Sequence, residues 1–86
     1  MEMTDAEFDV LNVLYFVTPF QEVVAESGLS IESVRDTLGG LLNRGWVRCY
    51  EGPGKELMPD EVDFPEDFGR YHYLATKAGL LAHNGR

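Results

Sequence analysis

The chain has 86 residues, of which 44% are hydrophobic and 26% charged, and its formal net charge is −8. This length and composition indicate one globular domain, residues 1–86, with a single core, and they exclude a disordered chain. No apolar run approaches the ~20 residues of a membrane span, and the acidic N-terminus is unlike a signal peptide. We therefore expect a cytoplasmic protein without a membrane partner.

The negative charge is concentrated in the first part of the sequence. Residues 1–37 contain eight acidic residues and one basic residue, whereas residues 38–86 contain seven acidic and six basic residues. A surface that attracts an anion therefore has to come from the second half of the chain. Cys49 has no neighbours at metal-ligand spacing and is interpreted as a buried strand residue. No metal site and no cofactor are predicted.

The first predicted element is a helix over residues 5–16. Thr4 and Glu7 have the spacing of a capping box, in which each side chain satisfies a backbone amide of the first turn. Apolar residues then recur at three- and four-residue spacing on one face: Phe8, Leu11, Leu14 and Tyr15. This spacing predicts that the helix buries one side.

A second helix is predicted over residues 19–27. Thr18 has the chemistry of a cap, Pro19 suits the first helical position, and Gln21 would complete a second capping box. Gly28 follows as the expected left-handed residue that ends this helix.

The third helix is predicted over residues 31–44, after Ser30 as its cap. Its apolar stripe is expected to be buried: Val34, Leu38, Leu41 and Leu42. Gly39 and Gly40 lie inside this helix, where each costs about 1 kcal/mol relative to alanine. We therefore expect a neighbouring element to pack closely against the helix backbone at these glycines.

After Gly45 the hydrophobic pattern alternates, as it does in strands. Residues 46–50 and 70–75 are rich in strand formers and predict two antiparallel strands. A short closing helix is predicted over residues 77–83.

The acidic loop at residues 51–69, which joins the two predicted strands, contains three prolines and is too long for a tight turn. It also contains five large apolar residues: Leu57, Met58, Val62, Phe64 and Phe68. We expect these residues to fold back on the body of the domain. Docking on a basic and apolar partner is the alternative.

The order of these elements and two sequence segments resemble bacterial winged helix-turn-helix regulators of the MarR and PadR kind. The segments are EVVAESGLSIESVRDTLGGLLNRGWV and HYLATKAG. The resemblance implies an α+β winged helix-turn-helix fold. In that fold, a three-helix core precedes a two-stranded ribbon and a short C-terminal helix. Residues 51–69 would be the wing, which is unusually long and acidic in this chain. It also implies a transcription regulator that binds duplex DNA, with a homodimer as one possible assembly.

Carried over by position, the resemblance assigns two sets of contact residues. The third helix would present its reading residues to DNA or to another partner: Glu32, Ser33, Arg35, Asp36, Thr37 and Asn43. Three cations would contact phosphate: Arg44, Arg48 and Lys55.

The acidic residues of the third helix leave a second interpretation open. Glu32 and Asp36 repel phosphate, although a carboxylate can accept a hydrogen bond from cytosine, and Glu32 also favours the helix dipole. The alternative is an acidic winged-helix interaction module whose partner is a basic protein. One positive face around the candidate cations would favour DNA, whereas a patchwork of charges would favour the protein partner.

An enzyme is not predicted, and no catalytic residue is assigned. His72 lies on a predicted strand and His83 near the C-terminus. Neither histidine has a sequence neighbour that marks a nucleophile, a general base or a metal site.

Overall fold

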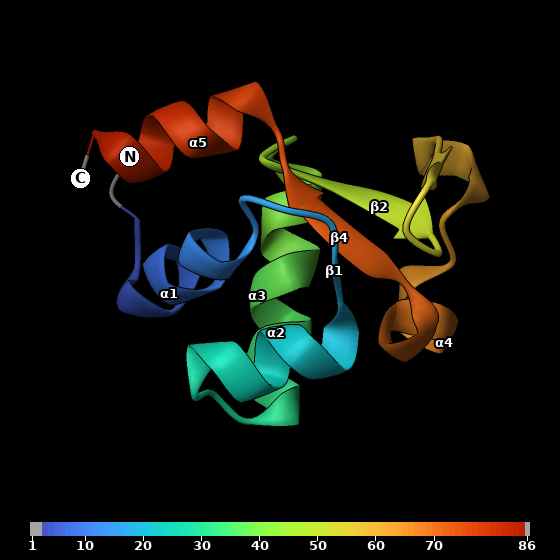
Figure 1. Cartoon of the computed structure of the whole chain (residues 1–86), viewed down its shortest axis with the longest axis horizontal. Coiled ribbons are helices and arrows are strands. Elements are labelled where there is room, and N and C mark those ends of the chain that lie inside the picture. The colour runs from blue at the N-terminus through green and yellow to red at the C-terminus, as the bar shows by residue number, and fades with distance from the viewer. Residues whose placement is uncertain (1–2, 86) are drawn as a thin grey trace.

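A computed structural model describes residues 3–85 and shows an α+β fold, in which five α-helices pack with one four-stranded antiparallel sheet (Figure 1). The helices are α1 (Asp5–Val13), α2 (Phe20–Ser27), α3 (Ile31–Asn43), α4 (Phe64–Asp67) and α5 (Lys77–Asn84). The strands are β1 (Thr18–Pro19), β2 (Val47–Glu51), β3 (Lys55–Leu57) and β4 (His72–Ala75). Two short 3-10 helices lie on either side of α4: η1 (Pro59–Glu61) and η2 (Phe68–Arg70).

The strand order is β1-β4-β2-β3. The predicted pairing of the two long strands is confirmed, because β2 and β4 are antiparallel neighbours with Val47 opposite Ala75 and Cys49 opposite Tyr73. β4 begins at His72 and not at residue 70, because Arg70 still belongs to η2. Two further strands were not predicted. β1 pairs with β4, and β3 pairs with β2 through Cys49 and Leu57.

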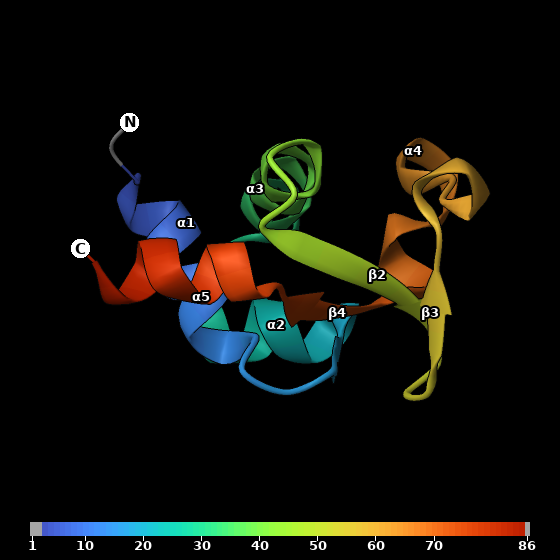
Figure 2. The same cartoon turned by 90° about the horizontal axis from the view of Figure 1, so that it is seen from above.

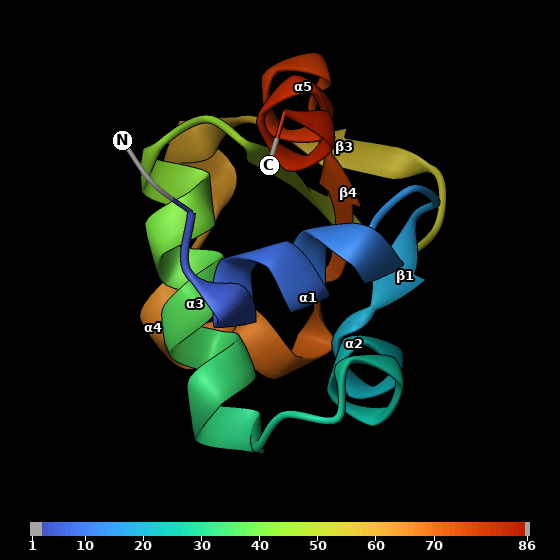
Figure 3. The same cartoon turned by 90° about the vertical axis from the view of Figure 1, so that its left-hand side faces the viewer.

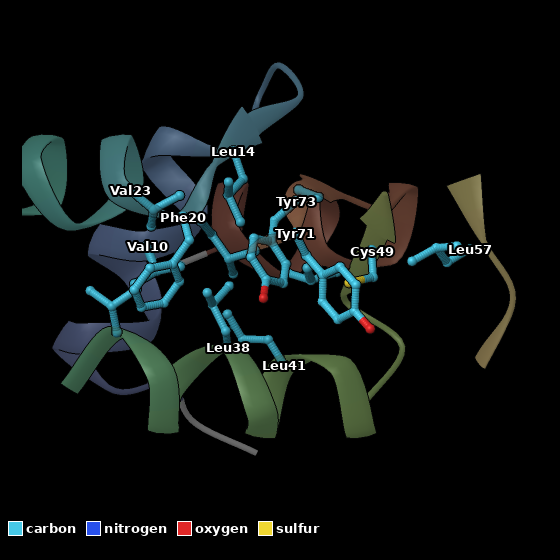
Figure 4. Close-up of a cluster of buried hydrophobic side chains, with 14 residues drawn as sticks. Val10, Leu14, Phe20, Val23, Leu38, Leu41, Cys49, Leu57, Tyr71 and Tyr73 are labelled. Atoms are coloured by element: carbon cyan, nitrogen blue, oxygen red, sulfur yellow. The ribbon is translucent and has the colours of Figure 1, made fainter. Parts of the chain in front are cut away.

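The core lies between α1, α2, α3 and the sheet. Figure 4 shows Leu38 and Leu41 of α3 pointing toward Tyr73, whose side chain is fully buried. Val34, Leu38 and Leu41 have no exposed surface, so the predicted stripe of α3 is confirmed at these three positions. Leu42 differs from the prediction because it remains half-buried at the edge of the core.

The capping box of α1 is confirmed: Glu7 N donates to Thr4 Oγ1 over 3.1 Å and Thr4 N donates to Glu7 Oε1 over 2.9 Å. The helix ends at Val13, however, and not at residue 16. Leu14 leaves helical geometry, and its carbonyl accepts a hydrogen bond from Ala75 N at 3.0 Å. A contact with β4, distant in sequence, therefore ends α1.

The predicted cap of the second helix is wrong. The backbone of Thr18 is extended in β1 opposite Tyr73, and its hydroxyl donates to the carbonyl of Phe16 at 2.7 Å. The helix begins at Phe20, with Pro19 as its N-cap and no side-chain capping bond. Its end is as predicted, because Gly28 has a left-handed φ of 74°.

The segment at residues 51–69 folds back on the body of the domain, as predicted, except that Met58 stays exposed. It contains β3, η1 and α4 and then returns to β4. Tyr73 Oη donates to the carbonyl of Phe68 at 2.7 Å, and the ring of Phe68 contacts that of Phe20 with a centroid distance of 5.1 Å. Figure 2 shows that α3 and α4 project to the same side of β2.

Only one of the two glycines inside α3 is closely packed. A Cβ at Gly39 would lie 3.3 Å from Cε2 of Phe64, so the expectation of a close neighbour is confirmed there. At Gly40 a Cβ would meet nothing within 4 Å, so the same expectation is wrong. The 51–69 segment covers the side of α3 at Gly39 and leaves open the side at Gly40, about 100° further around the helix.

The C-terminal helix α5 packs on α1, as Figure 3 shows. The rings of Phe8 and His83 are stacked with centroids 4.3 Å apart, and Tyr15 Oη lies 3.0 Å from His83 Nδ1. Tyr15 was predicted to be buried with the core residues of α1, but its side chain is 42% exposed. It reaches past the core to α5.

Candidate interaction surface

The reading residues predicted from the sequence lie on three sides of α3. Glu32, Asp36 and Asn43 lie opposite the buried stripe and are exposed. Two of these three side chains are carboxylates. The side of α3 best placed to enter a groove of DNA therefore presents negative charge.

A second side of α3 faces α1. Ser33 and Thr37 are half-buried there, and Arg44 follows them at the end of the helix. Arg44 Nη1 lies 3.0 Å from Oε2 of Glu7, and the guanidinium lies 5.0 Å from the ring centre of Trp46. Arg44 thus joins α3 to α1 and already has a carboxylate partner that is largely buried.

The third side of α3 faces the 51–69 segment and carries Arg35. Its Nε lies 3.0 Å from Oδ1 of Asp36, and its guanidinium lies 5.9 Å from the ring centre of Phe68. Arg35 is therefore held between an acid of its own helix and an aromatic ring of the 51–69 segment.

The two remaining phosphate candidates lie on the β2–β3 hairpin. Arg48 Nη1 is 3.4 Å from Glu56 Oε1, and Lys55 Nζ is 3.7 Å from Glu51 Oε1. Each basic residue predicted to contact DNA therefore has a carboxylate within 3.7 Å. Arg35 and Arg48 lie along one concave surface, described below, but their acidic partners Asp36 and Glu56 lie along it too, so the surface is not uniformly positive.

Among residues 3–85, Lys77 is the one basic residue without an acidic partner within salt-bridge distance, since Arg70 pairs with Asp67 at 3.5 Å. Lys77 begins α5 and is exposed. Lys77 lies on the same concave surface as Arg48, which is already paired with Glu56. The surface is a patchwork of charges.

A groove of about 1240 Å³ separates α3 from the 51–69 segment and reaches the start of α5. The sheet contributes three buried residues to its lining: Val47, Cys49 and Leu57. Half-buried apolar side chains from α3 and from the 51–69 segment also line it: Leu42, Val62, Phe64 and Phe68. Several large apolar side chains thus remain accessible along a single concave surface.

The sequence contains two signals for this groove, but their combination was not recognised. Gly39 and Gly40 indicated a special environment along α3, and the apolar residues of the acidic segment indicated folding back. In the structure, Phe64 packs on Gly39 and so fixes one wall, whereas Gly40 lines the open part of the groove. Lys77 of α5 also lines the groove, although it follows the end of α3 by more than thirty residues in the sequence.

Two buried groups have a raised pKa: Cys49, which lines the groove, and Tyr73 in the core. Burial raises the pKa of the Cys49 thiol to about 12, so the thiol is protonated at neutral pH. Burial also raises the pKa of Tyr73, and the nearby Cys49 and Tyr71 add to this shift. Neither group offers an anion for nucleophilic attack.

The described part of the chain contains no group of three or more His, Cys, Asp or Glu residues that could hold a metal ion. No helix within residues 3–85 is both long and apolar enough to cross a membrane. His83 is buried against Phe8 and Tyr15, where it connects α5 to α1.

Comparison with protein-family models, curated proteins and solved structures gave no significant match.

Proposed function

We propose that the chain is an acidic winged-helix interaction module that binds a basic protein partner through α3 and the neighbouring 51–69 segment, and that it does not read duplex DNA. The 51–69 segment would be the wing. A regulatory role in the cytoplasm is consistent with this proposal.

The winged-helix assignment is supported by the order and connection of the elements. The left-handed turn at Gly28 joins α2 to α3, and α3 leads directly into β2. β2 and β4 form an antiparallel ribbon, and the short β1 adds to its edge. A fold of this kind is used by proteins with different ligands, so the ligand has to be argued from the surface.

The pairing of the candidate cations carries the functional proposal. Arg35, Arg44, Arg48 and Lys55 each have a carboxylate partner, and the exposed side of α3 adds Glu32. DNA binding draws most of its affinity from phosphate contacts with cations, whereas here an approaching phosphate meets acids at each position. A basic protein surface would instead find complementary charge.

Duplex DNA remains the second candidate, and one observation favours it. The ion pairs of Arg35, Arg48 and Lys55 are exposed, and exposed pairs contribute only about 0–1 kcal/mol. Phosphate could displace the acids from these cations. Three phosphate contacts then predict that a plot of log affinity against log salt concentration has a slope near −3.

An electrophoretic mobility-shift experiment with random-sequence duplex DNA separates the two candidates. The test variant is Glu32→Gln/Asp36→Asn, which removes two negative charges from α3 and frees Arg35 from its acidic partner. The matched control is Asp9→Asn/Glu22→Gln, which removes two exposed acids from α1 and α2. All proteins are compared at about 50 mM salt, where phosphate contacts are strong.

The proposal predicts no shifted band for the wild-type protein or for either variant. A DNA-binding α3 predicts instead a band for the test variant that is stronger than that of the control. A wild-type band that persists at about 150 mM salt would contradict the proposal outright.

A further inference from the structure

We propose that the groove between α3 and the 51–69 segment binds an amphipathic, positively charged helix of the partner protein. This inference rests on the proposed function and specifies it, because it names the surface used and the chemistry of the segment bound.

The dimensions of the groove fit a short helix. Its lining runs along α3 from Arg35 to Asn43, which is about 12 Å at a rise of 1.5 Å per residue. A bound helix with apolar residues at positions i, i+4 and i+7 places them over about 10 Å. The groove volume of about 1240 Å³ accommodates such a row of side chains.

The floor of the groove favours a helix over an extended peptide. β2 pairs with β4 at positions 47–50 and with β3 at positions 49–51, so most of its backbone groups are already hydrogen-bonded within the sheet. An extended peptide over this floor would leave its own backbone unpaired, whereas a helix satisfies its backbone internally. Recognition would then come from side-chain contacts alone.

Half-buried apolar residues provide those contacts. Leu42 lies on the α3 wall, whereas Val62 and Phe64 lie on the opposite wall. Gly40 has no side chain and open space beside it, so an incoming side chain can approach the backbone of α3 there. Burial of such residues is the main source of affinity in helix-in-groove complexes.

The groove lining contains two ion pairs, Arg35 with Asp36 and Arg48 with Glu56, so the unpaired charges next to the lining decide which charge a bound helix should carry. Asp60, Asp63 and Glu66 alternate along the sequence with Pro59, Val62 and Pro65 of the lining. None of these three acids has a basic partner among residues 3–85. The net charge of −8 adds long-range attraction for a cation.

The positive charge of Lys77 opposes the binding of a cation at the α5 end of the groove. It lines the α5 end of the groove and has no acidic partner among the described residues. The positive side chains of the bound helix should therefore lie along the 51–69 segment, away from α5.

The test uses a fluorescein-labelled peptide of about 14 leucine and lysine residues, with leucine at helical spacing, and measures binding by fluorescence anisotropy. One control peptide replaces every lysine with glutamate. A second control contains the same leucine and lysine residues in an order without helical periodicity. We expect the periodic lysine peptide to bind at least about tenfold more tightly than either control, because only it matches both the apolar row and the charge.

Substitutions in the groove then locate the binding site. Leu42→Gln and Val62→Gln should each weaken binding of the periodic lysine peptide by about tenfold. Leu81→Gln is the matched control, because Leu81 is an exposed apolar residue of α5 that does not line the groove, and it should change affinity by less than about twofold. Gly40→Leu is a second groove variant that fills open space without disturbing the core, and it should also weaken binding. Thermal melting of each variant confirms that it is folded.

The inference is overturned if the periodic lysine peptide does not bind, if the glutamate peptide binds equally well, or if folded Leu42→Gln and Gly40→Leu retain wild-type affinity. The mobility-shift experiment identifies a separate failure. If duplex DNA binds tightly to the wild-type protein, the proposed function fails, whereas loss of peptide binding without any DNA binding removes only the assignment of this groove.

Discussion

Replacing Gly79 with alanine tests how α5 is attached to the rest of the fold. A Cβ at Gly79 would overlap the carbonyl oxygen of Trp46 and lie 3.0 Å from its carbonyl carbon. The same carbonyl accepts a hydrogen bond from Thr76 N at 2.9 Å, and Thr76 Oγ1 donates to the carbonyl of Gly45 at 2.8 Å. The added methyl group therefore meets rigid backbone at the junction where α5 begins.

The expected cost combines two opposing effects. Overpacking costs about 1–3 kcal/mol and tends to the upper end here, because the clash is with backbone rather than with a flexible side chain. Alanine returns up to about 1 kcal/mol through its higher helix propensity. We expect Gly79→Ala to lower the free energy of unfolding by about 2 kcal/mol, and the melting temperature by about 8–16 °C for a domain of this size.

Gly40→Ala is the matched control, because it makes the same chemical change in a helix where the Cβ has open space. It should raise the free energy of unfolding by about 0.5–1 kcal/mol and the melting temperature by about 2–8 °C. Both variants are compared with the wild type by thermal melting followed by circular dichroism. If Gly79→Ala melts at or above the wild-type temperature, the close approach between α5 and Trp46 is wrong.

Two other predictions concern buried residues. Leu38→Ala should lower the free energy of unfolding by about 2–5 kcal/mol, since Leu38 is fully buried, and a melting temperature close to wild type would show that the register of α3 is wrong. Cys49 should resist iodoacetamide at pH 8.5 in the folded protein and react once the protein is unfolded, because burial holds its pKa at about 12 compared with an ordinary value of 9.0. Because the pKa of Cys49 is lower in the unfolded chain than in the folded protein, the unfolded chain loses the thiol proton at a lower pH. The contribution of Cys49 to stability is therefore fully present below pH 9 and is lost as the pH rises toward 12.

Local sequence chemistry predicted those features of the fold that depend on nearby residues. The capping box of Thr4 and Glu7, the cap at Ser30 and the left-handed Gly28 all involve groups within a few residues of each other. Their geometry follows from short-range hydrogen bonding and steric limits, so the sequence pattern was sufficient. The alternation of β2 and β4 likewise predicted their pairing.

Contacts between distant segments could not be predicted in the same way. Threonine is a residue type that can cap a helix, but Thr18 pairs with Tyr73 in β1 and therefore does not cap α2. Gly39 indicated a close neighbour, but no local signal identified Phe64 as that neighbour or placed the start of α5 beside β2. The acid partner of Arg44 also comes from another helix, through Glu7.

The central claim is that the protein uses the groove beside α3 to bind a basic helix and does not use the exposed side of α3 to bind DNA. Two-dimensional NMR of the ¹⁵N-labelled protein, titrated in parallel with the periodic lysine peptide and with duplex DNA, tests this claim most directly. We predict that the peptide shifts the amide signals of Gly40, Leu42 and Val62, and that DNA shifts none. Shifts at Glu32, which does not line the groove, on addition of DNA, with no response of Leu42 and Val62 to the peptide, would contradict the claim.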